Sequence, residues 1–156
     1  MSRSEPTAND IVRVGKVAAK YEERHTVTVN FEDRGDGLTT KELPVGTSLT
    51  LKNHSYALPD VGEHVICLFY GNGLSEGVVI STIYDKKNSP PCANEDRYYF
   101  EFEGGAHVLV DRKDKFIQIQ DFEGSFILMK DGDISIQAAA NIHLNSGGKA
   151  VSLKEG

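Results

Sequence analysis

Apolar and polar residues alternate along most of this chain, and helical periodicity is scarce. Between residues 25 and 31, for example, Val27, Val29 and Phe31 stand at every second position. That spacing predicts a strand with one buried face. Glycine, aspartate and asparagine interrupt the alternation at short intervals, as is typical of turns between antiparallel strands. The pattern therefore predicts an all-β fold.

The first half of the chain is expected to hold five strands, with a long irregular stretch, 45–60, between the third and the fourth. Five strands with the long connection in that place are the layout of a small OB-fold barrel. The expected strands are 11–19, Thr26–Phe31, 39–44, His64–Phe69 and Gly77–Ile83. The alternation places these side chains in the barrel interior: Val12, Val14, Val27, Val29, Val65, Cys67 and Val79.

The second half contains an internal repeat. Pairs of apolar residues two positions apart recur every eight or nine residues, with turn residues such as Gly104-Gly105 between them. This period predicts a series of short strands, each with two inward apolar positions. The pairs are Phe100/Phe102, Val108/Val110, Ile117/Ile119, Phe126/Leu128, Ile134/Ile136, Ile142/Leu144 and Val151/Leu153.

The length of the repeat indicates how the strands assemble. One coil of a single-chain β-helix needs ~20 residues and a propeller blade ~40–50, whereas this repeat holds one strand and one turn. An ordinary meander stays open as an alternative. However, two buried side chains at ~2 kcal/mol each barely offset the ordering of eight residues at ~1–2 kcal/mol per residue. Three copies wound around one axis would give every strand lateral partners and a shared dry interior, so we expect an intertwined trimeric β-helix, or β-prism needle. Its core would hold Val108, Val110, Ile117, Ile119, Phe126, Leu128, Ile134, Ile136, Ile142 and Leu144.

A change in composition separates the two halves. Residues 85–96 combine charge, asparagine and serine with Pro90-Pro91, which is typical of a semi-rigid linker. The predicted organisation is a flexible N-terminus at 1–10, an OB-fold domain at 11–84, a linker at 85–96 and a triple-stranded β-helix needle at 97–156.

The charge balance is acidic: 23 Asp and Glu against 17 Lys and Arg give a formal net charge of −6. We expect no nucleic-acid partner, because such binding usually depends on basic side chains that neutralise phosphates. No apolar run approaches the ~20 residues of a membrane helix. The first ten residues also lack the apolar core of a secretory signal, so we expect synthesis and folding in the cytoplasm.

Candidate chemistry is sparse. Cys67 lies in an apolar run and Cys92 in the linker, so we expect two reduced thiols, one buried and one exposed. The five histidines are scattered, without metal-ligand spacing. The carboxylates of Asp111 and Asp114 are expected in a solvated turn. The sequence therefore predicts a non-enzymatic protein with no catalytic residue, no metal site and no cofactor.

Several segments resemble the phage baseplate assembly protein V family. Residues 10–17 resemble the opening of that family, and 58–65 contain its Pro-Asp-x-Gly-Glu-x-Val segment. Residues 132–138 and 141–144 resemble the needle repeats of that family and of VgrG spikes. The resemblance extends over nearly the whole chain from residue 10.

The resemblance implies a homotrimeric, membrane-piercing spike at the centre of a contractile phage tail baseplate or related injection machine. Its implied partners are tail-tube or baseplate hub proteins at the OB-fold end, and the host outer membrane during penetration. Its implied location is the virion, after assembly in the host bacterial cytoplasm. The alternative is an OB-fold module that binds single-stranded nucleic acid or an oligosaccharide.

The chain departs from its apparent relatives in two places. Some tail spikes carry a lysozyme domain between barrel and needle, and the 85–96 linker is too short for one. Several spikes hold an iron ion with a His-x-His near the C-terminus, where this chain has only His143. We expect His143 to point outward, because its neighbours are an inward pair. Only three residues follow the pair Val151 and Leu153, so we expect this end to bind a small separate tip-capping protein.

Overall fold

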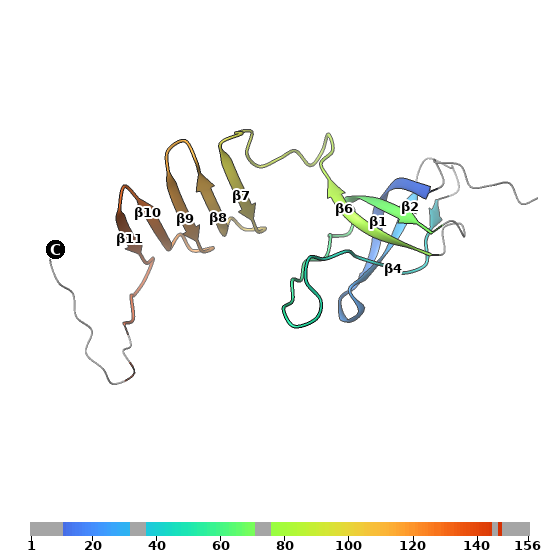
Figure 1. Ribbon diagram of the computed structural model, residues 1–156, viewed down its shortest axis with the longest axis horizontal. Helices are drawn as coiled ribbons and strands as arrows, with labels where there is room; N and C mark the ends of the chain where they lie inside the picture. The colour runs from blue at the N-terminus through green and yellow to red at the C-terminus, as the bar shows by residue number, and fades with distance from the viewer. Residues whose placement is uncertain (1–10, 32–36, 71–75, 145–146, 148–156) are drawn as a thin grey trace, which may run out of the picture. The chain divides into compact units, whose positions relative to one another are not determined.

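The computed structural model describes residues 11–31, 37–70, 76–144 and 147. As predicted, the described chain is all-β, and its strands are accompanied by a short 3₁₀ turn. It divides into two compact units, residues 1–89 and 90–156, and this boundary falls within the expected linker (Figure 1). Within the described residues, no helix is long and apolar enough to cross a membrane.

The first unit is an antiparallel sheet whose two ends approach each other. Its strand order is β3-β2-β1-β5-β6, and β4 also pairs with β2. Beyond β4, Val45 forms a parallel bridge with Val79 of β6, and the Gly46 N–H donates to the Val79 carbonyl at 2.8 Å. The elements are β1 (Val12–Tyr21), the 3₁₀ turn η1 (Glu22–Arg24), β2 (Thr26–Phe31), β3 (Leu38–Thr39), β4 (Leu43–Pro44), β5 (His64–Phe69) and β6 (Gly77–Ile83).

The expected third strand, 39–44, is two short strands in the structure. Thr40 stands between β3 and β4, and both of its polar groups bond to Val29 of β2. Its N–H donates to the Val29 carbonyl at 2.9 Å, and its hydroxyl accepts from the Val29 N–H at 3.0 Å. Because a side chain replaces the backbone partner there, the regular ladder is interrupted.

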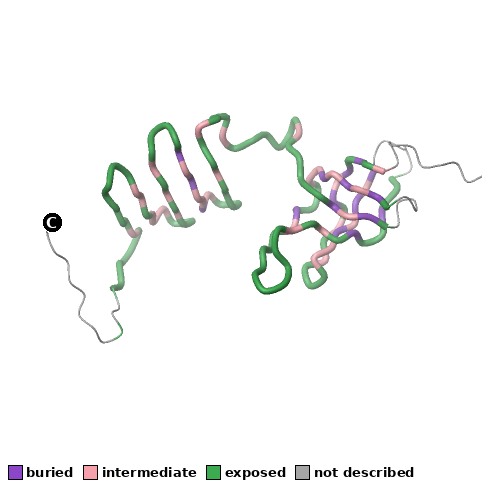
Figure 2. Tube along the Cα trace, in the orientation of Figure 1, coloured by how far each residue is buried: buried purple, intermediate pink, exposed green. Residues whose placement is uncertain are grey.

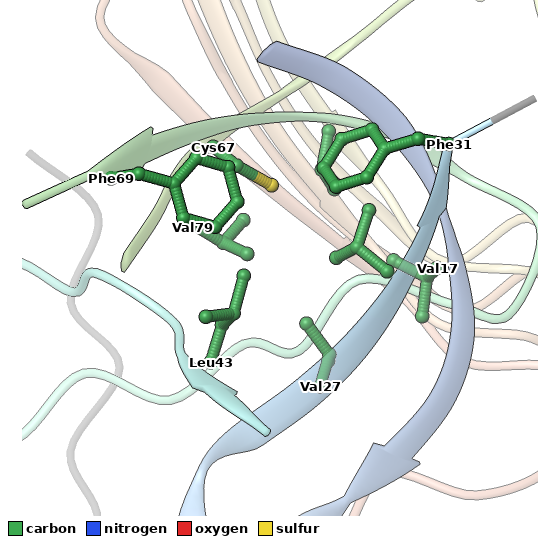
Figure 3. Packing of buried hydrophobic residues seen from close by; sticks show 9 residues of the cluster. Val17, Val27, Phe31, Leu43, Cys67, Phe69 and Val79 are labelled. Atoms are coloured by element: carbon green, nitrogen blue, oxygen red, sulfur yellow. The ribbon is translucent and has the colours of Figure 1, made fainter. Parts of the chain in front are cut away.

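One apolar cluster fills the interior of the first unit (Figure 3). Five of the seven side chains expected inside are buried in it. The cluster consists of Val17, Val27, Val29, Phe31, Leu43, Val65, Cys67, Phe69 and Val79.

The expectation that Val12 and Val14 are interior is wrong, because each is 49% exposed. In β1 the inward positions are instead Arg13, Gly15 and Val17. A Cβ at Gly15 would lie 2.6 Å from Val29 Cγ1, so only glycine fits there. The guanidinium of Arg13 lies 4.0 Å from the centre of the Phe31 ring, a cation–π contact that allows a charged residue to turn inward.

The second unit is a five-stranded antiparallel meander in the order β7-β8-β9-β10-β11. Strands β8, β9 and β10 each have both neighbours within the same chain, so the expectation that such strands obtain their lateral partners from other copies is wrong for these three. The strands are β7 (Arg97–Glu101), β8 (His107–Asp111), β9 (Phe116–Gln120), β10 (Phe126–Lys130) and β11 (Asp133–Gln137).

The repeat does not continue as a sixth strand. Residues 138–144 form no strand, and Ile142 and Leu144 are exposed. The expectation that Ile142 and Leu144 are inward positions of a strand is therefore wrong in the single chain. The last pair, Val151 and Leu153, lies outside the described residues.

We predict that Gly15→Ala destabilises the first unit by about 1–3 kcal/mol, the usual effect of overpacking a core. The new methyl group would meet Val29 and the Phe31 ring within 2.7 Å. Chemical denaturation measures the loss. Thr28→Ala, which changes an outward position on β2, should alter the free energy of unfolding by less than half as much; equal effects would contradict this role of Gly15.

Candidate assembly interface

The register of the second unit gathers its apolar side chains on one side of the sheet. Residues paired across antiparallel strands point to the same face, and Ile119 pairs with both Val108 and Ile127. The same alignment continues through all five strands. We call this surface the apolar face; it consists of Tyr98, Phe100, Val108, Val110, Ile117, Ile119, Ile127, Met129, Ile134 and Ile136.

Most of the apolar face is open to solvent in the single chain. Exposure is 39% at Ile117 and reaches 67% at Ile134 and 73% at Tyr98. Figure 2 shows the contrast with the first unit, where the buried positions are concentrated. A continuous apolar surface of ten side chains is larger than soluble monomers usually expose, and such surfaces mark sites of association.

A groove of ≈ 380 Å³ hollows one end of this face. Its lining includes Ile119, Ile127 and Ile136 from three adjacent strands, and Ile142 from the segment that follows β11. The face is therefore not flat but offers a concave apolar surface into which side chains of a partner can pack.

The opposite face of the sheet is more polar, with Gln118, Gln120, Lys130, Ser135 and Gln137 among its side chains. It also carries five apolar or aromatic side chains: Tyr99, Leu109, Phe116, Phe126 and Leu128. A sheet with an apolar face and a more polar face is suited to bury the first and leave the second in water.

Phe126 and Leu128 lie on this opposite face, so their expected place beside Ile117 and Ile119 is wrong. Phe126 pairs with Gln120, whereas the next residue, Ile127, pairs with Ile119. Four consecutive apolar residues, 126–129, carry no alternation, so their pattern does not specify the register. The pairing with β9 decides it, and a shift of one residue exchanges the two faces.

The turn between β8 and β9 is organised by Asp111, a buried carboxylate. Its side chain is 2% exposed and accepts from the backbone N–H groups of Lys113 at 3.0 Å and Asp114 at 2.8 Å. It also forms an ion pair with Arg97 at 2.9 Å. The hydrogen bond from Asp114, followed by the contact with Arg97, lowers the pKa of Asp111. The expectation of a solvated Asp111 is therefore wrong.

A second aspartate has the same role one repeat later. Asp121 accepts from the backbone N–H groups of Glu123 at 2.9 Å and Ser125 at 2.8 Å, in the turn between β9 and β10. Side chains that bond backbone groups two to four residues ahead fix the length of a turn. These two turns therefore help to hold the rows of the apolar face in register.

Groups suited to catalysis or metal binding do not converge in the described structure. No three His, Cys, Asp or Glu side chains among the described residues could hold a metal ion. His143 is exposed, as are its two neighbours. Burial raises the pKa of Cys67 to about 11, which keeps the thiol protonated and unreactive at neutral pH. Cys92 is free and half-buried rather than exposed.

Comparison of the chain with protein-family models and with curated proteins finds no match. The apolar face, which the strand register defines directly, is therefore the main structural indication of function.

We predict that acid destabilises the second unit partly through Asp111. Its pKa is lowered in the folded protein, so its contribution is fully present above the unfolded value of about 3.9 and is lost as pH falls through the lower folded value. Denaturation between pH 2 and 7 should show a weaker acid-induced loss for Asp111→Asn than for the wild type. Asp133→Asn, at an exposed position, is the control and should retain the wild-type dependence; an unchanged profile for Asp111→Asn would contradict the prediction.

Proposed function

We propose that the protein is the central spike of a contractile phage tail or related injection machine, a non-enzymatic homotrimer with an OB-fold barrel and a β-prism needle. The observation that carries the proposal is the apolar face of the second unit, which needs a cover that its own sheet does not provide. Three copies that turn their apolar faces toward one axis would supply that cover.

The strand length supports three copies. A five-residue strand spans about 17 Å. If the strands run across the axis and form the three sides of a triangle, each sheet lies about 5 Å from the axis. That distance is half the ~10 Å spacing of packed sheets. The two inward side chains of each strand would then fill the interior. Four copies would place each sheet roughly 8–9 Å from the axis and leave a hollow centre.

The proposed needle does not require strands exchanged between copies, because β8, β9 and β10 already have both neighbours in their own chain. The copies associate through their apolar faces. Adjacent strands rotate by roughly 20–25° on average, so four steps from β7 to β11 amount to about 90°. That twist would wind the three chains around one another and make the β-helix intertwined.

The strand order of the first unit supports an OB-fold barrel. Strand β1 pairs with both β2 and β5, β5 pairs with β6, and a parallel contact between Val45 and Val79 joins the two ends. If β3 and β4, which both pair with β2, are counted as one interrupted strand, this is the five-stranded, partly open barrel arrangement expected for that fold.

The mechanical role rests on stiffness. A prism with an apolar interior and hydrogen-bonded walls resists bending, since any local opening would expose both apolar area and backbone groups to water. The remaining parts of the proposal follow from the family resemblance: hub proteins at the barrel end, the host outer membrane as target, a place in the virion baseplate, and a tip-capping protein at Val151 and Leu153.

We predict that the purified protein sediments as a trimer of about 51 kDa, three times the chain mass of 17.1 kDa. Ile136→Asp should abolish the trimer, because it brings three unpaired carboxylates together in an apolar interior at several kcal/mol each. Ile136 is largely exposed in the single chain, so the substitution disrupts no packing within the chain, and the barrel should stay folded.

The matched control is Gln137→Asp, one residue away on the polar face; it should sediment as the wild type does. A monomeric or dimeric wild type at micromolar concentration would overturn the trimeric spike. Equal assembly of the two variants would show that the apolar face is not the interface.

A further inference from the structure

The outer surface of the first unit differs from strand to strand. The outward positions of β2 are polar: Thr26, Thr28 and Asn30. On the neighbouring strands β1, β5 and β6, five outward positions at one end of the sheet are apolar, and the register places them side by side. Lys16, His64 and Ser81 border them on the same face. We call this second surface the outer patch; it consists of Val12, Val14, Ile66, Leu68 and Val78.

The pattern of β5 indicates that the outer patch is covered in the functional state. Strands with one face in water alternate apolar and polar residues, whereas strands buried on both faces are almost continuously apolar. Strand β5 has five consecutive apolar residues, 65–69, and β1 adds Val12 and Val14, each 49% exposed in the single chain. In contrast, β2 alternates strictly.

We infer that the outer patch is the contact through which the barrels of neighbouring copies pack together. This inference rests on the trimer proposed above and adds a second interface to it, separate from the apolar face of the needle. The five side chains carry no charge, and Lys16 lies at the border of the patch, so the apolar centres of identical patches can meet without repulsion between like charges.

The size of the outer patch favours a tethered copy over a separate protein. Five aliphatic side chains cover at most a few hundred Å², well below the ~800 Å² per partner that independent proteins bury in a stable complex. A copy already held by the needle does not need that area. The 13 residues between β6 and β7 span roughly 45 Å at most. Barrels tethered that closely face each other at effective concentrations in the millimolar range.

Cysteine chemistry on the full chain tests the inference. Val14→Cys and Thr28→Cys are made separately with Cys92→Ser; Cys67 is buried, with its pKa raised to about 11, and should not react. Thr28 is less exposed than Val14 in the single chain, so a single barrel predicts that Val14→Cys reacts at least as fast. Contact between barrels predicts that Val14→Cys reacts with a maleimide about tenfold more slowly than Thr28→Cys.

A short bis-maleimide cross-linker then tests whether the surface that covers the outer patch belongs to the barrel of another copy. Within a sedimenting trimer, Val14→Cys should form covalent dimers and Thr28→Cys should not. A trimer in which Val14→Cys reacts fast and does not cross-link would overturn the inference and leave the spike proposal standing. Slow reaction without cross-links would mean that another surface covers the outer patch, which also overturns it. Monomeric protein would overturn the spike proposal itself.

Discussion

The sheet of the second unit pairs the backbone of its inner strands within the chain but leaves its apolar side chains uncovered. Its inner strands find every neighbour within the chain, and the pairing that does so places ten apolar side chains on one side. Backbone hydrogen bonds contribute little net free energy, because they replace bonds to water. The sheet therefore depends on covering its apolar face, and the rest of the proposed architecture follows from that requirement.

The first unit is constructed differently. The bridge between Val45 and Val79 joins the two ends of its sheet, which encloses nine buried apolar side chains. The two largest, Phe31 and Phe69, are in edge-to-face contact. That interior gives the unit a core of its own. The strictly alternating β2 needs nothing on its outer side, whereas β1 and β5 present apolar residues on both sides.

Apolar runs bounded by turn residues predicted the strands His64–Phe69 and Gly77–Ile83 with their observed bounds. The sequence pattern failed where the decisive contact comes from elsewhere in the fold. Val14 was expected inside because valine is more often buried than arginine, but a tight contact at Gly15 and the stacking of Arg13 on Phe31 set the opposite register. In the candidate interface, the run 126–129 is apolar at every position, so only the pairing with β9 shows that Ile127 lies on the apolar face.

The two units therefore differ in how their folding depends on concentration. A closed core forms within one chain, so the barrel can fold independently of protein concentration. In the proposed trimer, the needle sheet gains most of its stabilisation when copies meet, so its folding is coupled to association and depends on concentration. Once the needle has formed, the short connection of 13 residues keeps the barrels close, and a patch too small to bind alone becomes sufficient. This order, with barrels first, needle second and contact between barrels last, would place the larger interface in the part of the proposed spike that bears the load.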